Sequence, residues 1–354
     1  HPDSVSFTRN INEDLQRRDF TVNAMAYNAE YGLVDPYGGK NDLKDKIIRC
    51  VGNPDTRFNE DALRILRALR FASVYGFSIE VNTSKSIFKN ADLLKNIATE
   101  RVISEFLKLI CGKDAVKILD AYRETIAVII PEITVMFNFN QNNIHHSYDL
   151  WQHTLIALGT IEPNPILRMT MLLHDIGKPS VKTTDNSGQS HFQGHQLESK
   201  KIADRILHRL RLPSDFINKT LLLIEYHDVR FNGSKKLMKK VMNVLGTDLT
   251  KQLLEVEYAD ISAQSEYQRE EKLGYLSTAK THLNEIIKDN ECFKLSQLDI
   301  NGKDVLNLGV KEGRDVGNIL DYLLMLVVDA NVPNKKSILI SKAKEYIYGN
   351  QINK

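Results

Sequence analysis

The sequence predicts a mainly α-helical protein of several domains, with a short α/β segment in its first part. At 354 residues the chain is too long for one ordinary hydrophobic core. Helical patterns of apolar residues dominate from Asn59 onward, whereas residues 1–52 contain only short strand-like runs and turn residues. We therefore expect a short α/β part followed by several helical blocks.

The composition is that of an ordinary globular protein, with 42% hydrophobic and 26% charged residues. The net charge of +2 excludes a grossly basic protein but leaves room for local basic faces, which nucleic-acid binding requires. The isolated cysteines Cys50, Cys111 and Cys292 form no disulfide or zinc pattern, so a cytoplasmic location is expected. No apolar run has the length of a membrane span, so no membrane partner is expected.

Short strands are expected in the first 52 residues. Phe20–Tyr27 fits a strand or a strand-to-helix segment, and Gly32–Asp35 fits a short strand closed by the turn residues 35–39. A further short strand is expected at three apolar residues, Ile47, Ile48 and Val51.

Helices are expected in the rest of the chain. Asn59 is a suitable N-cap for a helix that begins at Glu60. Further helical patterns cover Leu93–Ile110, Ala115–Ile130, Asn318–Val328 and Lys336–Tyr348. A His-rich helical block spans residues ~140–265 and a Lys-rich block spans ~270–354. The one biased stretch is the basic patch 235–240.

The segment Glu60–Phe71 has the features of a nucleotide-binding helix. At roughly 100° per residue, its apolar residues gather on one face and its charged residues on the other. The charged face carries Glu60, Asp61, Arg64, Arg67 and Arg70. A carboxylate accepts a hydrogen bond from the exocyclic amine of C or A, and a guanidinium donates to ring acceptors or phosphates. The same pattern also fits an exposed face with ion pairs, such as Asp61 with Arg64.

Three short patterns follow one another in a fixed order: RRDFTVNAMAYN (17–28), VDPYGG (34–39) and EDALRILRALRF (60–71). In this order and at this spacing they resemble the head and neck of a class II tRNA nucleotidyltransferase, the family of CCA-adding enzymes and poly(A) polymerases. The resemblance implies that Asp61 and Arg64 imitate Watson–Crick edges. It also implies that Arg67 and Arg70 contact phosphate or sugar.

The same resemblance assigns roles to the other two patterns. RRDFT resembles the family's ribose-recognising motif, with Arg18 and Asp19 as contacts and Asn23 in support, and VDPYGG resembles the flexible connector between head and neck. The family's Mg²⁺-binding Asp-x-Asp has no counterpart among the 354 residues. We therefore expect the larger C-terminal part of such an enzyme, whose Mg²⁺ ligands for nucleotidyl transfer are cut off or supplied elsewhere.

Histidines and aspartates recur through the His-rich block. Imidazoles and carboxylates from several packed helices are a normal way to hold a first-row divalent metal ion. The pair His174-Asp175 closes an apolar helix that Gly177 terminates, so side chains of neighbouring helices can converge there. His191 and His208 fit ordinary structural roles.

The order His…His-Asp…Asp and the string HDIGKP (174–179) resemble the HD phosphohydrolase superfamily. The implied metal ligands are His153, His174, Asp175 and Asp260, with His195 and His227 resembling the extra ligands of two-metal members. The implied chemistry is metal-assisted attack of water on a phosphate ester. Such ligands suit Mn²⁺, Fe²⁺, Co²⁺ or Ni²⁺ better than structural zinc. Some CCA-adding enzymes carry this domain and bacterial poly(A) polymerases generally do not, which favours CCA addition.

Residues Leu298–Val327 resemble the RNA-binding tail of these enzymes. Lys303, Lys311 and Arg314 would supply charge for a tRNA backbone, with turns at Gly302 and Gly313 that bring N–H groups near phosphates. The same residues fit a small helical cap with ordinary surface lysines.

The resemblance as a whole implies a mainly α chain in four parts. These are a C-terminal remnant of an α/β nucleotidyltransferase head (1–57), a helical neck (58–138), a helical HD domain (139–268) and a helical tRNA-binding tail (269–354). The implied activity is addition or repair of the 3′ CCA of tRNA with CTP and ATP. Two alternatives remain: a stand-alone HD metal phosphohydrolase, or a non-catalytic subunit that recruits tRNA to a separate head subunit. A poly(A) polymerase is the nearest alternative within the same class.

Overall fold

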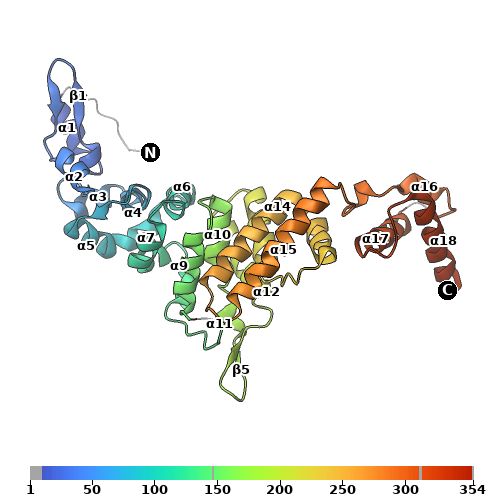
Figure 1. Cartoon of the computed structure of the whole chain (residues 1–354). Helices are drawn as coiled ribbons and strands as arrows, with labels where there is room; N and C mark the ends of the chain where they lie inside the picture. The colour runs from blue at the N-terminus through green and yellow to red at the C-terminus, as the bar shows by residue number, and fades with distance from the viewer. Residues whose placement is uncertain (1–9, 146, 311–312, 353–354) are drawn as a thin grey trace. The chain divides into compact units, whose positions relative to one another are not determined.

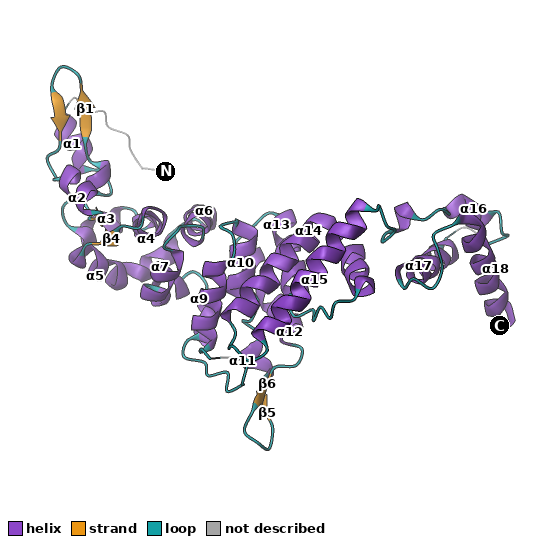
Figure 2. Cartoon of the chain, viewed as in Figure 1, coloured by secondary structure: helices purple, strands orange, loops and turns teal. Residues whose placement is uncertain are grey.

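A computed structural model describes residues 10–145, 147–310 and 313–352. The protein is mainly helical, as the sequence predicts (Figures 1 and 2). Within the described residues, the strands form three two-stranded pairs. Among the helices of this part of the chain, none has both the length and the apolar character that a membrane crossing requires.

The chain divides into two compact units. Unit 1 comprises His1–His227 and Ala259–Tyr267, and unit 2 comprises Asp228–Tyr258 and Gln268–Lys354. The helix α14 (Lys235–Ala263) begins in unit 2, and its last residues belong to unit 1. The four ranges expected from the sequence stay a prediction.

Unit 1 begins with short elements. They are α1 (Ile11–Gln16), the 3₁₀ turn η1 (Thr21–Asn23), β1 (Ala26–Asn28), β2 (Gly32–Val34), α2 (Gly39–Asp45) and β3 (Ile47–Ile48). Strands β1 and β2 form an antiparallel hairpin, and β3 pairs in parallel with β4 (Ser78–Ile79). The strands expected near residues 32 and 47 are confirmed. Val51 is instead buried in a small core with Leu15 and Ala24.

The helix expected to begin at Glu60 is wrong in two respects. Helix α3 (Pro54–Glu60) begins earlier, because Asn53 caps it and proline suits the first helical position. Asn59 is therefore no N-cap, and its amide donates to the Asp55 carbonyl at 2.8 Å. The helix also breaks at Asp61, which has an extended backbone (φ −151°, ψ 101°), before α4 (Leu63–Tyr75) continues.

The following helices are shorter than expected, because turns interrupt them. They are α5 (Val81–Asn90), η2 (Ala91–Asn96), α6 (Thr99–Ile110), α7 (Ala115–Ala121), α8 (Arg123–Ala127) and η3 (Pro131–Met136). Helix α4 packs mainly against α6. The fully buried side chains of Leu66, Leu69, Phe106 and Ile110 are part of the core there.

The second part of unit 1 is a helical bundle. Its elements are α9 (Leu150–Thr160), α10 (Pro165–Leu173), α11 (Lys178–Val181), β5 (Thr183–Thr184), β6 (Ser190–His191), α12 (His195–Arg209) and α13 (Ser214–Tyr226). Helix α13 packs against both α10 and α12. Trp151 is fully buried on α9, and its indole N–H donates to Asp120 at 3.1 Å, which ties α9 to α7.

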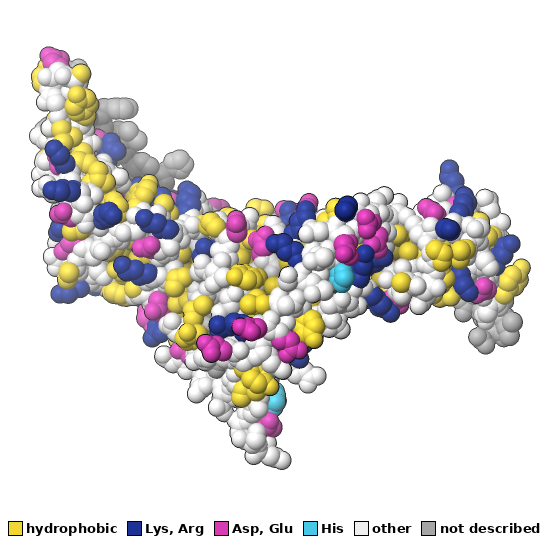
Figure 3. Space-filling view, viewed as in Figure 1, with side chains coloured by type: hydrophobic (Ala, Val, Ile, Leu, Met, Phe, Trp, Pro, Cys, Tyr) yellow, Lys and Arg dark blue, Asp and Glu magenta, His cyan; other side chains and the backbone are white. Residues whose placement is uncertain are grey.

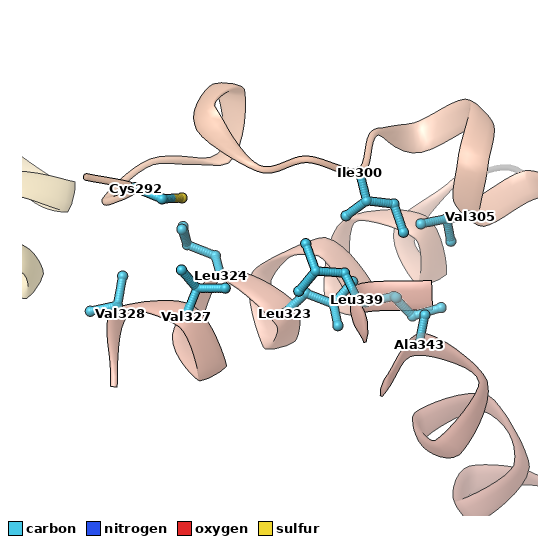
Figure 4. Packing of buried hydrophobic residues seen from close by; sticks show 10 residues of the cluster. Cys292, Ile300, Val305, Leu323, Leu324, Val327, Val328, Leu339 and Ala343 are labelled. Carbon is cyan, nitrogen blue, oxygen red and sulfur yellow. The ribbon is translucent and has the colours of Figure 1, made fainter. Parts of the chain in front are cut away.

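Unit 2 contains two long helices and a smaller helical group at its end. After α14 come α15 (Arg269–Lys288), η4 (Leu295–Gln297), α16 (Gly302–Leu306), α17 (Arg314–Val328) and α18 (Lys336–Ile352). The core of the smaller group joins Leu323 and Leu324 of α17 to Leu339 of α18 and to Val305 (Figure 4). The two C-terminal helices are confirmed, each extended at one end.

The basic patch 235–240 is neutralised inside unit 2. Two of its four lysines lie within 2.7 Å of Glu291 oxygens, and the other two lie 3.1 Å from Asp329. These pairs connect α14 to the segments after α15 and α17. The patch therefore cross-links helices.

Gly112 stands at a close approach between α4 and the turn after α6, which gives a test of this packing. A Cβ atom at Gly112 would lie 2.1 Å from Ser73 Oγ and 2.6 Å from the Ser73 carbonyl carbon. Gly112→Ala should therefore destabilise unit 1 by about 1–3 kcal/mol, as overpacking does. The measurement is urea unfolding followed by the fluorescence of the single tryptophan, Trp151.

Gly274 in α15 is the matched control, because nothing lies within 4 Å of a Cβ built there. Gly274→Ala should stabilise its helix by up to about 1 kcal/mol and leave the Trp151 transition of unit 1 unchanged. A Trp151 transition that stays at the wild-type midpoint in Gly112→Ala would contradict the packing argument.

Candidate functional site

The residues expected to read a nucleotide meet where residues 16–19 lie against α3 and α4. Arg64 donates from Nη2 to the carbonyl of Arg17 at 2.9 Å and pairs through Nη1 with Glu60 at 2.9 Å. Arg57 donates to the Gln16 carbonyl at 3.1 Å. The two guanidiniums thus hold the end of α1 against the helices that carry Asp61 and Arg64.

Asp19 is fixed from two sides. One carboxylate oxygen accepts from Arg67 Nε at 2.7 Å, and the other accepts from the N–H of Phe20 at 2.9 Å and the amide of Asn23 at 3.2 Å. The structure therefore brings the expected residues Asp19 and Arg67 together, with Asn23 supporting Asp19. Arg18 is exposed, and it pairs with Asp14 at 2.9 Å.

Asp61 lies at the break between α3 and α4. Its Oδ1 accepts from the N–H of Leu63 at 3.1 Å, and its Oδ2 lies 2.9 Å from Arg101 of α6. The Asp61 side chain is 33% exposed, so a ligand can reach it. The ion pair suggested between Asp61 and Arg64 is not formed, because the helix break turns Asp61 toward α6.

Arg70 is separated from this cluster. It pairs with Glu105 of α6, and its guanidinium carbon lies 4.0 Å from the centre of the Phe71 ring. The side chain is only 15% exposed. Sequence reasoning missed Arg57 and Arg101. A helix correctly started at Pro54 would have placed Arg57 beside Glu60, whereas nothing in the sequence pattern signals the contact with Arg101.

A second cluster contains four histidines whose rings are held in the same way. Each Nδ1 lies within hydrogen-bond distance of a backbone carbonyl, which can only accept, so Nδ1 carries the proton and Nε2 faces inward. The pairs are His153 with Ala263 at 3.2 Å, His174 with Met171 at 2.8 Å, His195 with Phe192 at 2.8 Å and His227 with Ile224 at 2.6 Å. Backbone partners of this kind fix the tautomer of metal-binding histidines.

Asp175 lies between two sets of imidazoles. Its Oδ2 lies 3.3 Å from His153 Nε2 and 3.2 Å from His174 Nε2. Its Oδ1 lies 3.3 Å from His195 Nε2 and 3.5 Å from His227 Nε2. One carboxylate is therefore shared by two groups of side chains.

The two groups correspond to the ligands expected from the sequence. The first ligand group is His153, His174, Asp175 and Asp260, and the second ligand group is Asp175, His195 and His227. Within each group, the candidate ligand atoms all lie within 4.8 Å of one another. They come from α9, the end of α10, the start of α12, the end of α13 and the part of α14 in unit 1.

The geometry of the cluster fits metal ions. Asp175 is 1% exposed; its Oδ1 forms no hydrogen bond with the described residues, whereas its Oδ2 lies 2.6 Å from the Lys178 ammonium. His195 Nε2 and His227 Nε2 are 3.2 Å apart, and each lies within 3.5 Å of Asp175 Oδ1. Both nitrogens and Asp175 Oδ1 could therefore ligate one cation, since imidazole and carboxylate are common ligands of divalent metals.

Charge in the cluster is balanced internally. Burial would lower the pKa of His174, but Asp175 and Asp260 raise it to about 10, and the same carboxylates raise the pKa of His153. Burial would raise the pKa values of both aspartates, but the facing imidazoles hold them well below the usual range. A metal ion would take the place of these protons, because its ligands must be deprotonated.

Lys178 is a residue of this site that sequence reasoning did not select, although HDIGKP contains it. Its ammonium lies 2.6 Å from Asp175 Oδ2 and donates to Gln141 at 3.1 Å, and the residue is 5% exposed. His191, which pairs with Asp185 at 2.8 Å, and His208 lie outside both ligand groups.

The residues expected to bind RNA lie in the smaller helical group of unit 2. Lys303 is exposed on α16, and Arg314 is exposed at the start of α17, while Lys311 lies outside the described residues. Gly313 has a φ of 117°, which fits the expected turn. On the face in Figure 3, Lys and Arg side chains alternate with Asp and Glu, in keeping with the small net charge.

Three protein-family models match the chain. The Poly A polymerase head domain matches residues 1–49, the probable RNA and SrmB-binding site of polymerase A matches 76–137, and the putative tRNA nucleotidyltransferase domain 2 matches 195–343. The first two of these ranges flank or contain the residues expected to read a nucleotide.

Curated relatives and solved structures agree with these models. The CCA-adding enzyme of Ligilactobacillus salivarius (strain UCC118) is 30% identical over 355 residues, covering 98% of this chain and 74% of the relative. The CCA-adding enzyme of Streptococcus thermophilus (strain CNRZ 1066) is 31% identical, covering 79% and 75%.

Among solved structures, the Bacillus stearothermophilus CCA-adding enzyme in complex with CTP has a TM-score of 0.71 at 25% identity, covering 99% of this chain and 78% of its own. The Thermotoga maritima enzyme in complex with tRNA, at 22% identity and a TM-score of 0.52, covers 95% and 74% and supports the fold alone. The family predicted from the sequence is thus confirmed: the chain belongs to the CCA-adding enzyme family of nucleotidyltransferases.

Proposed function

We propose that this chain takes part in adding or repairing the 3′ CCA of tRNA, with CTP and ATP as substrates. The observation that supports this is the placement of Arg64 against the Arg17 carbonyl, with Asp61 directly before the same helix, in a chain similar to an enzyme solved with CTP. Asp61 offers a carboxylate and Arg64 a guanidinium, the two chemistries needed to recognise the pairing edge of C or A.

The contacts of these two side chains support a reading role. Hydrogen bonds from Leu63 and Arg101 orient the Asp61 carboxylate, and each carboxylate oxygen has more than one lone pair for a further donor. Arg64 uses three hydrogen bonds within the described residues to hold its position, and a guanidinium has five N–H donors. Both side chains are therefore held in position and can still form further hydrogen bonds with a base.

We further propose that the histidine cluster holds divalent transition-metal ions and hydrolyses a phosphate ester. The observation that supports this is Asp175, whose two oxygens each face two imidazole Nε2 atoms. Mn²⁺, Fe²⁺, Co²⁺ or Ni²⁺ suits these ligands, and such an ion would act as a Lewis acid toward the ester.

The chain's own residues have distinct roles in this second reaction. Backbone carbonyls of Ala263 and Met171 orient His153 and His174, and the Lys178 ammonium would attract an anionic phosphate. Candidate substrates are 2′,3′-cyclic nucleotides and phosphorylated RNA ends. The alternative is that the cluster only cross-links helices.

The chain by itself is expected to leave tRNA unextended, because its 354 residues contain no Asp-x-Asp to place Mg²⁺ at the α-phosphate. The test incubates the protein with tRNA lacking CCA, Mg²⁺, CTP and ATP, and follows 3′ extension on a sequencing gel. A separate head polypeptide that carries the carboxylates should restore extension. Clear extension by the pure chain would contradict this expectation.

Asp61→Ala should weaken the choice of CTP and ATP over UTP and GTP while leaving tRNA binding nearly unchanged. Losing one good base contact typically costs about 1–3 kcal/mol of discrimination. The measurement is the incorporation ratio for the four nucleotides with the head polypeptide supplied. Asp92→Ala is the control, because Asp92 is an exposed carboxylate whose ion-pair partner in the described part of the chain is the nearby Lys95. Wild-type selectivity in Asp61→Ala would show that Asp61 does not read the base.

The wild-type chain should bind transition metal after reconstitution with Mn²⁺ and cleave a 2′,3′-cyclic nucleotide, and the double variant His174→Ala/Asp175→Ala should do neither. His208→Ala, on the surface outside both ligand groups, should behave as wild type. Bound metal is measured by elemental analysis, and turnover by product release. Absence of metal in the wild type would refute the metal site, whereas bound metal without turnover would indicate a structural cluster.

A further inference from the structure

The two ligand groups share Asp175, so the distance between them depends on how α12 is held against residues 174–178. His195 is the first residue of α12, and His174 caps the end of α10. His153 and Asp260 of the first ligand group come from α9 and α14. A shift of α12 alone would therefore move His195 away from the rest of the second ligand group while leaving the first group in place.

Gly177 lies directly against the first turns of α12. Its N–H donates to the Ser199 hydroxyl at 2.9 Å, and Ser199 is fully buried. A Cβ atom at Gly177 would lie 2.5 Å from the Ser199 backbone nitrogen, 2.8 Å from the His195 carbonyl oxygen and 2.9 Å from the Glu198 carbonyl carbon. All three are backbone atoms of α12, so none can yield by a side-chain rotation.

The need for glycine at this position is steric. Gly177 has φ −82° and ψ −14°, values that any residue adopts. Ordinary carbon contacts begin at about 3.5 Å, so a methyl group at Gly177 would push α12 away by roughly 1 Å. Metal–ligand distances tolerate a deviation of only about 0.2 Å. A displacement of this size would take His195 Nε2, now 3.3 Å from Asp175 Oδ1, out of the second ligand group.

We infer that Gly177, together with Ser199, is a positioning pair that sets the distance between the two ligand groups and thereby admits a second metal ion. This inference rests on the proposed metal site. The absence of a side chain at Gly177 lets α12 approach residues 174–178, and the hydrogen bond from the Gly177 N–H to the Ser199 hydroxyl holds α12 at that distance. Neither residue carries a ligand atom of either group.

The experiment reconstitutes the full chain with Mn²⁺ and counts bound ions per chain by elemental analysis after desalting. Electron paramagnetic resonance distinguishes a spin-coupled pair of Mn²⁺ ions from a single ion. The wild type should hold two coupled ions, and Gly177→Ala one ion with an uncoupled spectrum. His195→Ala removes a second-group ligand directly and should give the same spectrum as Gly177→Ala.

Ser199→Ala keeps the close approach and removes one hydrogen bond, so it should keep two ions with affinity for the second reduced about fivefold, the equivalent of roughly 1 kcal/mol. Trp151 fluorescence would reveal whether Gly177→Ala folds. If it does not, Ser199→Ala still tests the inference. Gly112→Ala is the control for overpacking, because it crowds unit 1 at Ser73 and should retain both ions.

Two coupled ions in folded Gly177→Ala, or an unchanged second affinity in Ser199→Ala, would overturn the inference and leave the proposed metal site intact. Loss of both ions from folded Gly177→Ala would also overturn it, because the first ligand group should survive. A wild type that binds a single ion would overturn the inference alone. A wild type that binds no metal would overturn the proposed function and the inference with it.

Discussion

The buried carboxylate of Asp175 is the constraint on which the second half of unit 1 depends. At 1% exposure an unpaired carboxylate would be very costly, so the surrounding helices must bring polar partners to it. They do so at their ends: α10 and α13 finish in His174 and His227, and α12 begins with His195. The hydrogen bonds from Nδ1 to backbone carbonyls then aim each ring at the same point. The same helix ends therefore form both the packing of the bundle and the candidate metal site.

The region that we propose to read a nucleotide is also held by charged side chains, here nearer the surface. Glu60 and Asp19 each hold a guanidinium, and Arg64 and Arg57 in turn bind the carbonyl oxygens at the end of α1. These contacts join residues some forty positions apart in the sequence, so the segment before β1 is fixed by charged side chains as much as by its small apolar core. A base-reading site needs such stiffness, because discrimination depends on donors and acceptors that stay in place.

Much of the fold could be predicted from the sequence, for reasons that individual residues illustrate. The string HDIGKP and the spacing of His153 and Asp260 were informative because their chemistry is rare outside a site, and the structure does bring these side chains together. The expected helix start at Glu60 is wrong because Asn53-Pro54 is a stronger start signal than Asn59. The partners of Asp61 and Arg70 could not be predicted, because Arg101 and Glu105 reach them through tertiary packing that no local pattern encodes.

The path of α14 has a consequence for how this protein can be divided. The helix starts in unit 2 and delivers Asp260 and the carbonyl of Ala263 to unit 1, after which the chain returns to unit 2. Neither unit is therefore a continuous stretch of sequence. A single cut in the loop after His227 would separate all four histidines of the cluster from Asp260, so a truncation at this loop leaves the first ligand group incomplete. During synthesis, likewise, the first ligand group becomes complete only after most of α14 has left the ribosome.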